Sequence, residues 1–178
     1  MLQLPQHFAI QIARAAKHDV QFKIGLFMTH GTLSYSFEIG GNRCGQMDVH
    51  RSNGYLRTVT EFETPETGHV LADFEVWFDG LKVIKARKKP LEWVAFAGLP
   101  NDAFPDCAYP LLIQKSQDSN FDYWCVDLEQ HREPVLHKVS RTDDLIVETR
   151  GKQVLRRFSM DDGIPAWIDW GGASSSLL

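Results

Sequence analysis

Four side chains that could do chemistry alternate along the sequence between Arg43 and Arg51. In a β-strand they would share one face, because successive side chains point to opposite sides: Cys44, Gln46, Asp48 and His50. Asp48 could orient the imidazole of His50 for acid–base work, and Cys44 could act as a nucleophile if its pKa were lowered. The competing interpretation is the solvent face of a half-buried strand, and the sequence leaves both open.

No other spacing in the chain predicts a metal or cofactor site. The seven histidines include no HExxH and no HxH, and no quartet of cysteine and histidine has zinc-ligand spacing. Dinucleotide and phosphate-binding glycine motifs and the GxSxG elbow of hydrolases are also missing from the sequence. We therefore expect no metal, no cofactor and no catalytic constellation, which favours a protein that is not an enzyme.

A second candidate site lies near the C-terminus, where aromatic and acidic residues gather. Its members are Trp167, Trp170, Asp161, Asp162 and Asp169. Tryptophan is enriched at the centres of protein interfaces, so the group could bind a partner. The alternative is a terminal segment that packs back over the sheet, since a large indole buries readily.

The composition predicts one soluble domain spanning residues 1–178. The chain is 43% hydrophobic and 24% charged, and no stretch approaches the roughly 18 consecutive apolar residues of a membrane-spanning helix. Its three cysteines form no CxxC pair, which favours free thiols in a reducing, cytoplasmic compartment. The net charge of −4 comes from residues 100–178, so nucleic acid and membrane surfaces are not the expected partners.

Hydrophobic periodicity predicts a β-rich α+β fold. Pro5 and an apolar stripe predict one helix over 4–18, and turns at Asn53-Gly54 and Asp79-Gly80 predict hairpins. Strands are expected at 20–26, 33–39, 43–51, 55–63, 70–78, 81–87, 91–99, 111–114, 121–128, 134–139, 145–149 and 154–159. The result is an antiparallel meander of about ten strands, curved or partly closed, with an N-terminal helix. Residues 100–110 are the expected subdomain seam, and the serine-rich tail is expected to be mobile.

Two segments in the second half resemble the middle of the SUKH superfamily of bacterial immunity proteins. They are LLIQKSQDSNFDYWCVDL (111–128) and EPVLHKVSRTDD (133–144), and the resemblance extends over about 111–158. The family's apolar strand, short turn and aromatic–Cys–Asp–Leu strand would be 111–113, 118–120 and 123–128, followed by a strand at Pro134-Val135. The resemblance implies a protein that neutralises a toxin by binding it, with no catalytic residue.

Two functions from different classes follow. The first is a non-catalytic intracellular protein of immunity type that binds a protein partner, such as a basic toxin domain, through the C-terminal aromatic–acidic group. The second is a small-molecule binder or enzyme whose curved sheet encloses a cavity lined by Cys44, Asp48 and His50. The two differ in which face of strand 43–51 is buried: the second requires Met47 and Val49 to face solvent.

Overall fold

Thirteen strands form one sheet in the part of the chain that the computed structural model describes, residues 30–117, 119–129 and 133–178. Its order is β6-β5-β4-β3-β2-β1-β13-β12-β11-β10-β9-β8-β7, and every neighbouring pair is antiparallel except the parallel pair β7–β8. The strands are β1 (Gly31–Ile39), β2 (Asn42–Ser52), β3 (Tyr55–Thr64), β4 (Gly68–Asp79), β5 (Lys82–Lys88), β6 (Val94–Ala95), β7 (Ala103–Pro105), β8 (Phe121–Val126), β9 (Val135–Thr142), β10 (Leu145–Arg150), β11 (Gln153–Asp161), β12 (Ile164–Asp169) and β13 (Ala173–Leu177).

The predicted antiparallel meander is confirmed for β1 to β5 and for β8 to β11. The tight turns lie where Gly40, Gly54 and Gly80 take positive φ, a conformation that costs glycine little. Along β2, Met47 and Val49 are buried and their neighbours are not, as an alternating strand requires. The predicted helix over 4–18 and the predicted strand over 20–26 lie outside the described residues.

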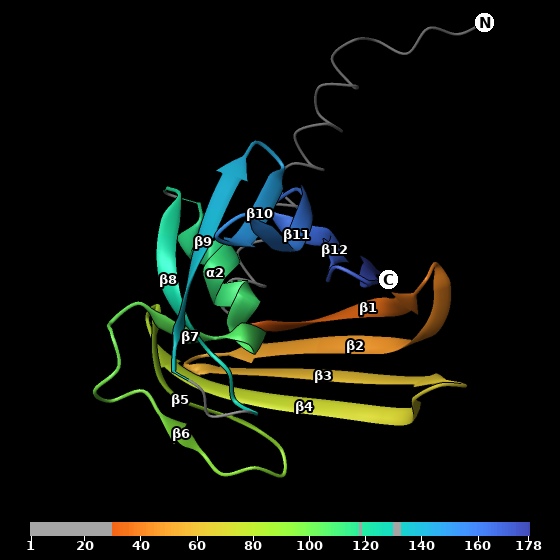
Figure 1. Cartoon of the computed structure of the whole chain (residues 1–178), viewed down its shortest axis with the longest axis horizontal. Helices are drawn as coiled ribbons and strands as arrows, with labels where there is room; N and C mark the ends of the chain where they lie inside the picture. The colour runs from red at the N-terminus through yellow and green to blue at the C-terminus, as the bar shows by residue number, and fades with distance from the viewer. Residues whose placement is uncertain (1–29, 118, 130–132) are drawn as a thin grey trace, which may run out of the picture.

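The sheet curls until its two ends approach each other, and the ladder of backbone hydrogen bonds does not join them (Figure 1). β5, near one end, passes close to β7 at the other. An ion pair crosses the same gap, since Lys88 Nζ lies 2.6 Å from Glu129 Oε1. Curvature therefore gives the sheet a concave face, and the core side chains of both halves point into it.

A short helical segment fills part of this concave face. It consists of the 3₁₀ helix η1 (Asp106–Ala108) and the helix α2 (Tyr109–Lys115). The first five residues of α2 are buried. The prediction of a strand over 111–114 is wrong, because Pro110 stands in the first turn of α2, where its missing N–H costs nothing. No helix within the described residues is long and apolar enough to cross a membrane.

Two other predictions for the middle of the chain need correction. The expected buried strand at 91–99 is reduced to the two residues of β6, and most of this segment is exposed because it runs along the sheet edge. The expected irregular seam at 100–110 contains β7, η1 and the start of α2, mostly buried. Strands from both sides of this segment belong to the same sheet.

The C-terminal tail, expected to be mobile, forms strand β13 and joins the two halves of the sheet. β13 pairs with β1 on one side and with β12 on the other. Ser175 is fully buried, and its Oγ accepts a 3.1 Å hydrogen bond from Nε1 of Trp170. The small side chains that suggested mobility are what allow a strand to fit against the crowded interior.

Ser175→Leu should therefore destabilise the fold by about 1–3 kcal/mol, because the larger side chain overpacks the core and removes the acceptor for Trp170. The measurement is the free energy of unfolding from chemical denaturation. Ser176→Leu, at the next and outward-facing position of β13, is the matched control and should change it by about 0.5 kcal/mol or less. Equal effects of the two substitutions would contradict the buried placement of Ser175.

Candidate functional site

A buried ion pair lies on the concave face, between Glu148 of β10 and Arg156 of β11. The two residues are direct cross-strand partners, and Arg156 Nε donates a 2.5 Å hydrogen bond to Glu148 Oε2. A register shift between Glu148 and Thr149 brings them opposite each other. Glu148 is 1% exposed, so the pair is withdrawn from water. In the protein interior, two opposite charges stay ionised only when they contact each other closely.

Two further strands complete the hydrogen bonding of this carboxylate. Tyr123 of β8 donates from its hydroxyl to Glu148 Oε1 at 2.6 Å, and His137 Nδ1 of β9 donates to the same oxygen at 2.7 Å. Burial alone would raise the pKa of Glu148, but the charge of Arg156 and these hydrogen bonds outweigh it and lower the pKa to about 2. Glu148 is therefore ionised at neutral pH.

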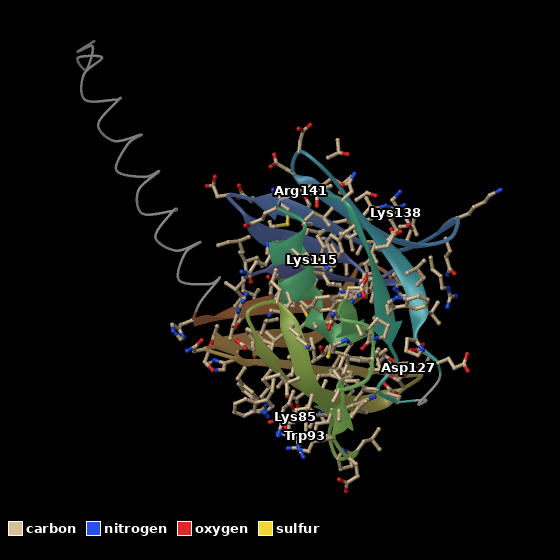
Figure 2. The ribbon with its side chains drawn as sticks, turned by 90° about the vertical axis from the view of Figure 1, so that its left-hand side faces the viewer. Lys85, Trp93, Lys115, Asp127, Lys138 and Arg141 are labelled. Atoms are coloured by element: carbon tan, nitrogen blue, oxygen red, sulfur yellow. The ribbon has the colours of Figure 1, made fainter. Side chains whose placement is uncertain are left out.

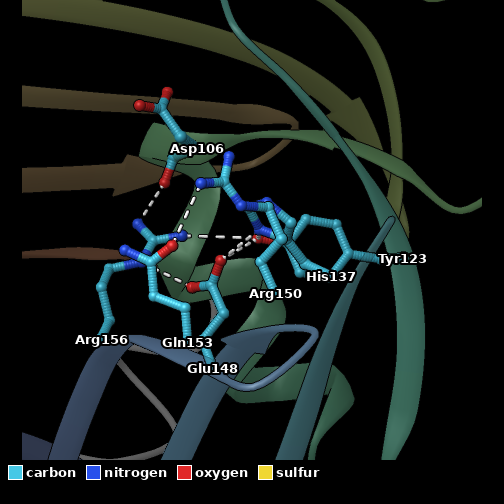
Figure 3. A network of polar contacts seen from close by, with 7 residues as sticks. All are labelled: Asp106, Tyr123, His137, Glu148, Arg150, Gln153 and Arg156. Atoms are coloured by element: carbon cyan, nitrogen blue, oxygen red, sulfur yellow. Dashed lines mark hydrogen bonds and ion pairs between the residues drawn. The ribbon is translucent and has the colours of Figure 1, made fainter. Parts of the chain in front are cut away.

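The same arginine ties the helical segment to the sheet. Arg156 Nη1 donates a 2.5 Å hydrogen bond to the backbone oxygen of Asp106, the first residue of η1 (Figure 3). Tyr109 of α2 then stacks on Phe158 of β11, with 5.7 Å between ring centroids, and meets Trp170 edge-on at 5.6 Å. We call Tyr123, His137, Glu148 and Arg156 the polar network; it fixes where η1 and α2 lie inside the sheet.

Because the helical segment covers only part of the concave face, a cavity of about 390 Å³ remains beside it. One wall is the inner face of β1 to β4, from Phe37, Met47, Thr58, Thr60, Phe62, Ala72 and Phe74. The opposite wall comes from the helical segment and the second half of the sheet, from Asp106, Cys107, Tyr109, His137, Glu148, Leu155, Arg156 and Trp170. The lining is thus largely aromatic and aliphatic, with the polar network at one end.

Asp106 marks the polar end of this cavity. Its side chain is exposed to the solvent that enters, and it also lines an adjoining recess of about 250 Å³ together with His137 and Leu155. The protein around it raises the pKa of Asp106 through desolvation, which the charge of Arg156 partly opposes. A carboxyl group in such a recess is crowded by protein although water still reaches it.

Burial favours the protonated form of the two thiols in the second half of the chain. All three cysteines are free. Burial raises the pKa of Cys107, in the cavity wall, well above its ordinary value, and burial raises that of Cys125 to about 12. Both therefore stay protonated and behave as small apolar groups. Within residues 30–117, 119–129 and 133–178, no cluster of three or more histidine, cysteine or acidic side chains could hold a metal ion.

The residues predicted as an interior site on β2 lie on its other face. Met47 and Val49 are buried, and His50 is exposed on the convex side, so Asp48 and His50 do not line the cavity. Asp48 accepts a 2.6 Å hydrogen bond from Ser34, whereas His50 pairs with Thr32. Cys44 and Asp48 border an outer depression of about 820 Å³ that His50 does not reach. The carboxylate therefore does not orient the imidazole.

The structure separates the aromatic and acidic residues predicted to bind a partner. Trp167 is 38% exposed on the outer face, and Asp169 pairs there with Arg157 at 2.9 Å. Trp170 points inward and lines the cavity. The remaining two, Asp161 and Asp162, are exposed at the turn between β11 and β12. Trp167 and Asp169 share the outer face of β12.

The chain matches no protein-family model and has no significant match among curated proteins. Among solved structures it is similar to a beta-barrel-like protein of a domain of unknown function, DUF1849, from Brucella abortus. The two share 14% sequence identity and a TM-score of 0.42, over 83% of this chain and 95% of that one. Function must therefore be inferred from the cavity and surfaces of this chain.

The polar network predicts an acid-sensitive fold. Since the pKa of Glu148 falls from 4.5 to about 2 on folding, its stabilising contribution is complete above about pH 4.5 and is lost as the pH falls toward 2. Glu148→Gln should cost about 3 kcal/mol at pH 7, because Arg156 stays buried without a counterion.

The measurement is the free energy of unfolding of wild type and of Glu148→Gln from pH 7 to pH 2.5. The difference between these two free energies should become smaller below pH 4.5. Glu61→Gln is the control, because Glu61 pairs with His69 and both side chains are more than half exposed. This substitution should change the free energy of unfolding little at any pH. A difference that stays constant with pH would show that Glu148 is not the titrating group.

Proposed function

We propose that this protein binds a small apolar molecule in the cavity between the β1–β4 face and the helical segment. The observation that carries the proposal is the lining: aromatic and aliphatic side chains face one another across about 390 Å³, with polar groups gathered at one end. Ligand sites typically enclose a few hundred Å³ or more and combine such walls with a few polar groups that orient the ligand.

Partial exposure of inward-facing aromatics supports this proposal. Phe37, Phe62 and Phe74 point to the concave side, yet each remains only half-buried because α2 does not extend over them. Covering apolar surface with a ligand removes it from water and favours binding by a free energy of about 25 cal/mol per Å². The incompletely covered rings therefore provide a driving force for binding an apolar ligand.

The polar end of the cavity favours binding over catalysis. Both oxygens of Glu148 accept hydrogen bonds, and with a pKa of about 2 the carboxylate is a poor general base at neutral pH. Arg156 is held by Glu148 and by the backbone oxygen of Asp106. Asp106, which is exposed and lines the cavity, is the acidic residue closest in character to a group that could meet a polar atom of the ligand.

Ala72→Phe should block the cavity, because Ala72 lies in its wall and a phenyl ring would occupy the free volume. Titration with the neutral fluorescent probe N-phenyl-1-naphthylamine should show about tenfold weaker binding or worse, equivalent to about 1.4 kcal/mol. Leu71→Phe is the matched control, since Leu71 is 55% exposed on the other face of β4. Equal probe affinity in wild type and Ala72→Phe would refute the proposal.

A second candidate function is binding of a protein partner, as expected of an immunity-type protein that binds a basic toxin domain in the cytoplasm. The observation that favours it is Trp167, whose cross-strand neighbours are Ser159 and Ser176. These short side chains leave the indole standing above the outer face of β12. An exposed tryptophan beside the solvent-exposed pair of Asp169 and Arg157 has the character of an interface centre with a polar rim.

Trp167→Ala combined with Asp169→Asn should weaken such a complex by at least about 2 kcal/mol while the protein stays folded. The measurement is affinity capture from the source cells, followed by titration of the captured protein against each variant. Asp161→Asn with Asp162→Asn, at the neighbouring turn, is the control and should retain the affinity. Unchanged affinity of the Trp167 and Asp169 double variant would exclude this surface.

A further inference from the structure

A second buried arginine, Arg51, lies on the concave face in a very different environment from Arg156. It belongs to β2, points inward and is 4% exposed. Its Nη2 donates a 2.7 Å hydrogen bond to Gln114 Oε1 near the C-terminal end of α2, and its guanidinium lies 5.2 Å from the ring centroid of Phe78. Both of these partners are uncharged.

The charge of Arg51 is not compensated within the described residues. Its Nε and Nη1 are buried and have no hydrogen-bond partner, and no acidic side chain among residues 30–117, 119–129 and 133–178 forms an ion pair with it. Burial lowers the pKa of Arg51, with no neighbouring charge acting against the desolvation. Arg156, by contrast, has Glu148 and a backbone oxygen. Withdrawing a cation from water without a partner costs several kcal/mol.

Arg51 lies in the wall of a recess of about 700 Å³ at one end of the sheet. The recess is bordered by the β2–β3 and β4–β5 turns, by Gln114 and by the side chains of Trp77, Phe78 and Ile84. Among the residues that the structure describes, His30 and Asp79 are the other titratable groups that line it, and both are exposed. Neither appears among the hydrogen bonds or ion pairs of Arg51, so the guanidinium is the buried charge of this recess.

We propose that this recess binds the anionic oxygen group, carboxylate or phosphate, of a small ligand against Arg51. An oxyanion accepts hydrogen bonds from a guanidinium at several nitrogens at once and supplies the charge that the protein does not. Gln114 accepts a hydrogen bond from Nη2, and Nε and Nη1 are the two nitrogens of the guanidinium that have no partner. The site is separate from the apolar cavity, because α2 places Tyr109 in the cavity wall and Gln114 at the recess.

The test compares wild type with Arg51→Met, which keeps an unbranched side chain in the apolar surroundings and removes its charge. Thermal unfolding is followed with sodium phosphate, sodium acetate or sodium chloride at equal ionic strength. At least one oxyanion should raise the melting temperature of wild type above its value in chloride and leave Arg51→Met unchanged. The two salts distinguish a phosphate site from a carboxylate site. Arg43→Met, an exposed arginine on the same strand, should respond as wild type does.

Gln114→Glu gives an independent readout that does not require Arg51→Met to fold. The substitution places a carboxylate 2.7 Å from the guanidinium, so it should raise the melting temperature in chloride and abolish the response to the oxyanion. Failure of both salts to stabilise wild type, or an equal response in Arg51→Met, would overturn the proposal. Neither result would bear on binding of the neutral probe in the apolar cavity, so the two proposals can fail separately.

Discussion

The position of α2 inside the sheet depends on one interaction, the buried pair of Glu148 and Arg156 with its bond to the backbone of Asp106. A helix of seven residues is too short to be stable by itself, so its place must come from outside it. Four neighbouring strands supply the polar network, and Arg156 extends it to η1. A buried ion pair often adds little stability compared with apolar residues, but its geometry is demanding. Its role here is to specify where the helical segment lies.

That position divides the interior into two unlike spaces. Beside η1, apolar walls and the polar network border a cavity that the exposed Asp106 also lines. At the other end of α2, Lys115, labelled in Figure 2, lies over the rings of Phe104 and Phe121. There Gln114 accepts a hydrogen bond from Arg51. The convex surface is built differently: Lys85 lies 4.6 Å from the ring centroid of Trp93, and Arg87 pairs with Glu75. The charged groups in these examples are solvated or paired with an opposite charge or an aromatic ring, so their desolvation costs the fold little free energy.

Much of the sheet could be predicted from the sequence, because alternation and glycine turns are local signals. The β2–β3 and β4–β5 hairpins follow from Asn53-Gly54 and Asp79-Gly80, and their inner faces follow from the period of two. The predictions of secondary structure were wrong where contacts with segments far away in the sequence decide the local structure. Leu111–Gln114 is an apolar run that suits a strand or a buried helix equally, although Pro110 was a signal for the helix. The serines of β13 carry no hydrophobic signal, and only pairing with β1 and β12 makes them a strand.

The interior sites were harder to predict, for a reason that Glu148 makes clear. Counted from the turn after Arg150, a regular hairpin would place Glu148 opposite Leu155, and only the register shift after Glu148 puts Arg156 there. Arg51 and Arg156 both occupy inward positions of well-predicted strands, yet one meets a carboxylate and the other an amide. Which partner an inward charge meets depends on strands and helices far away in the sequence. The pattern along a strand can show that a charge is buried, but only the packing shows whether the protein itself balances that charge.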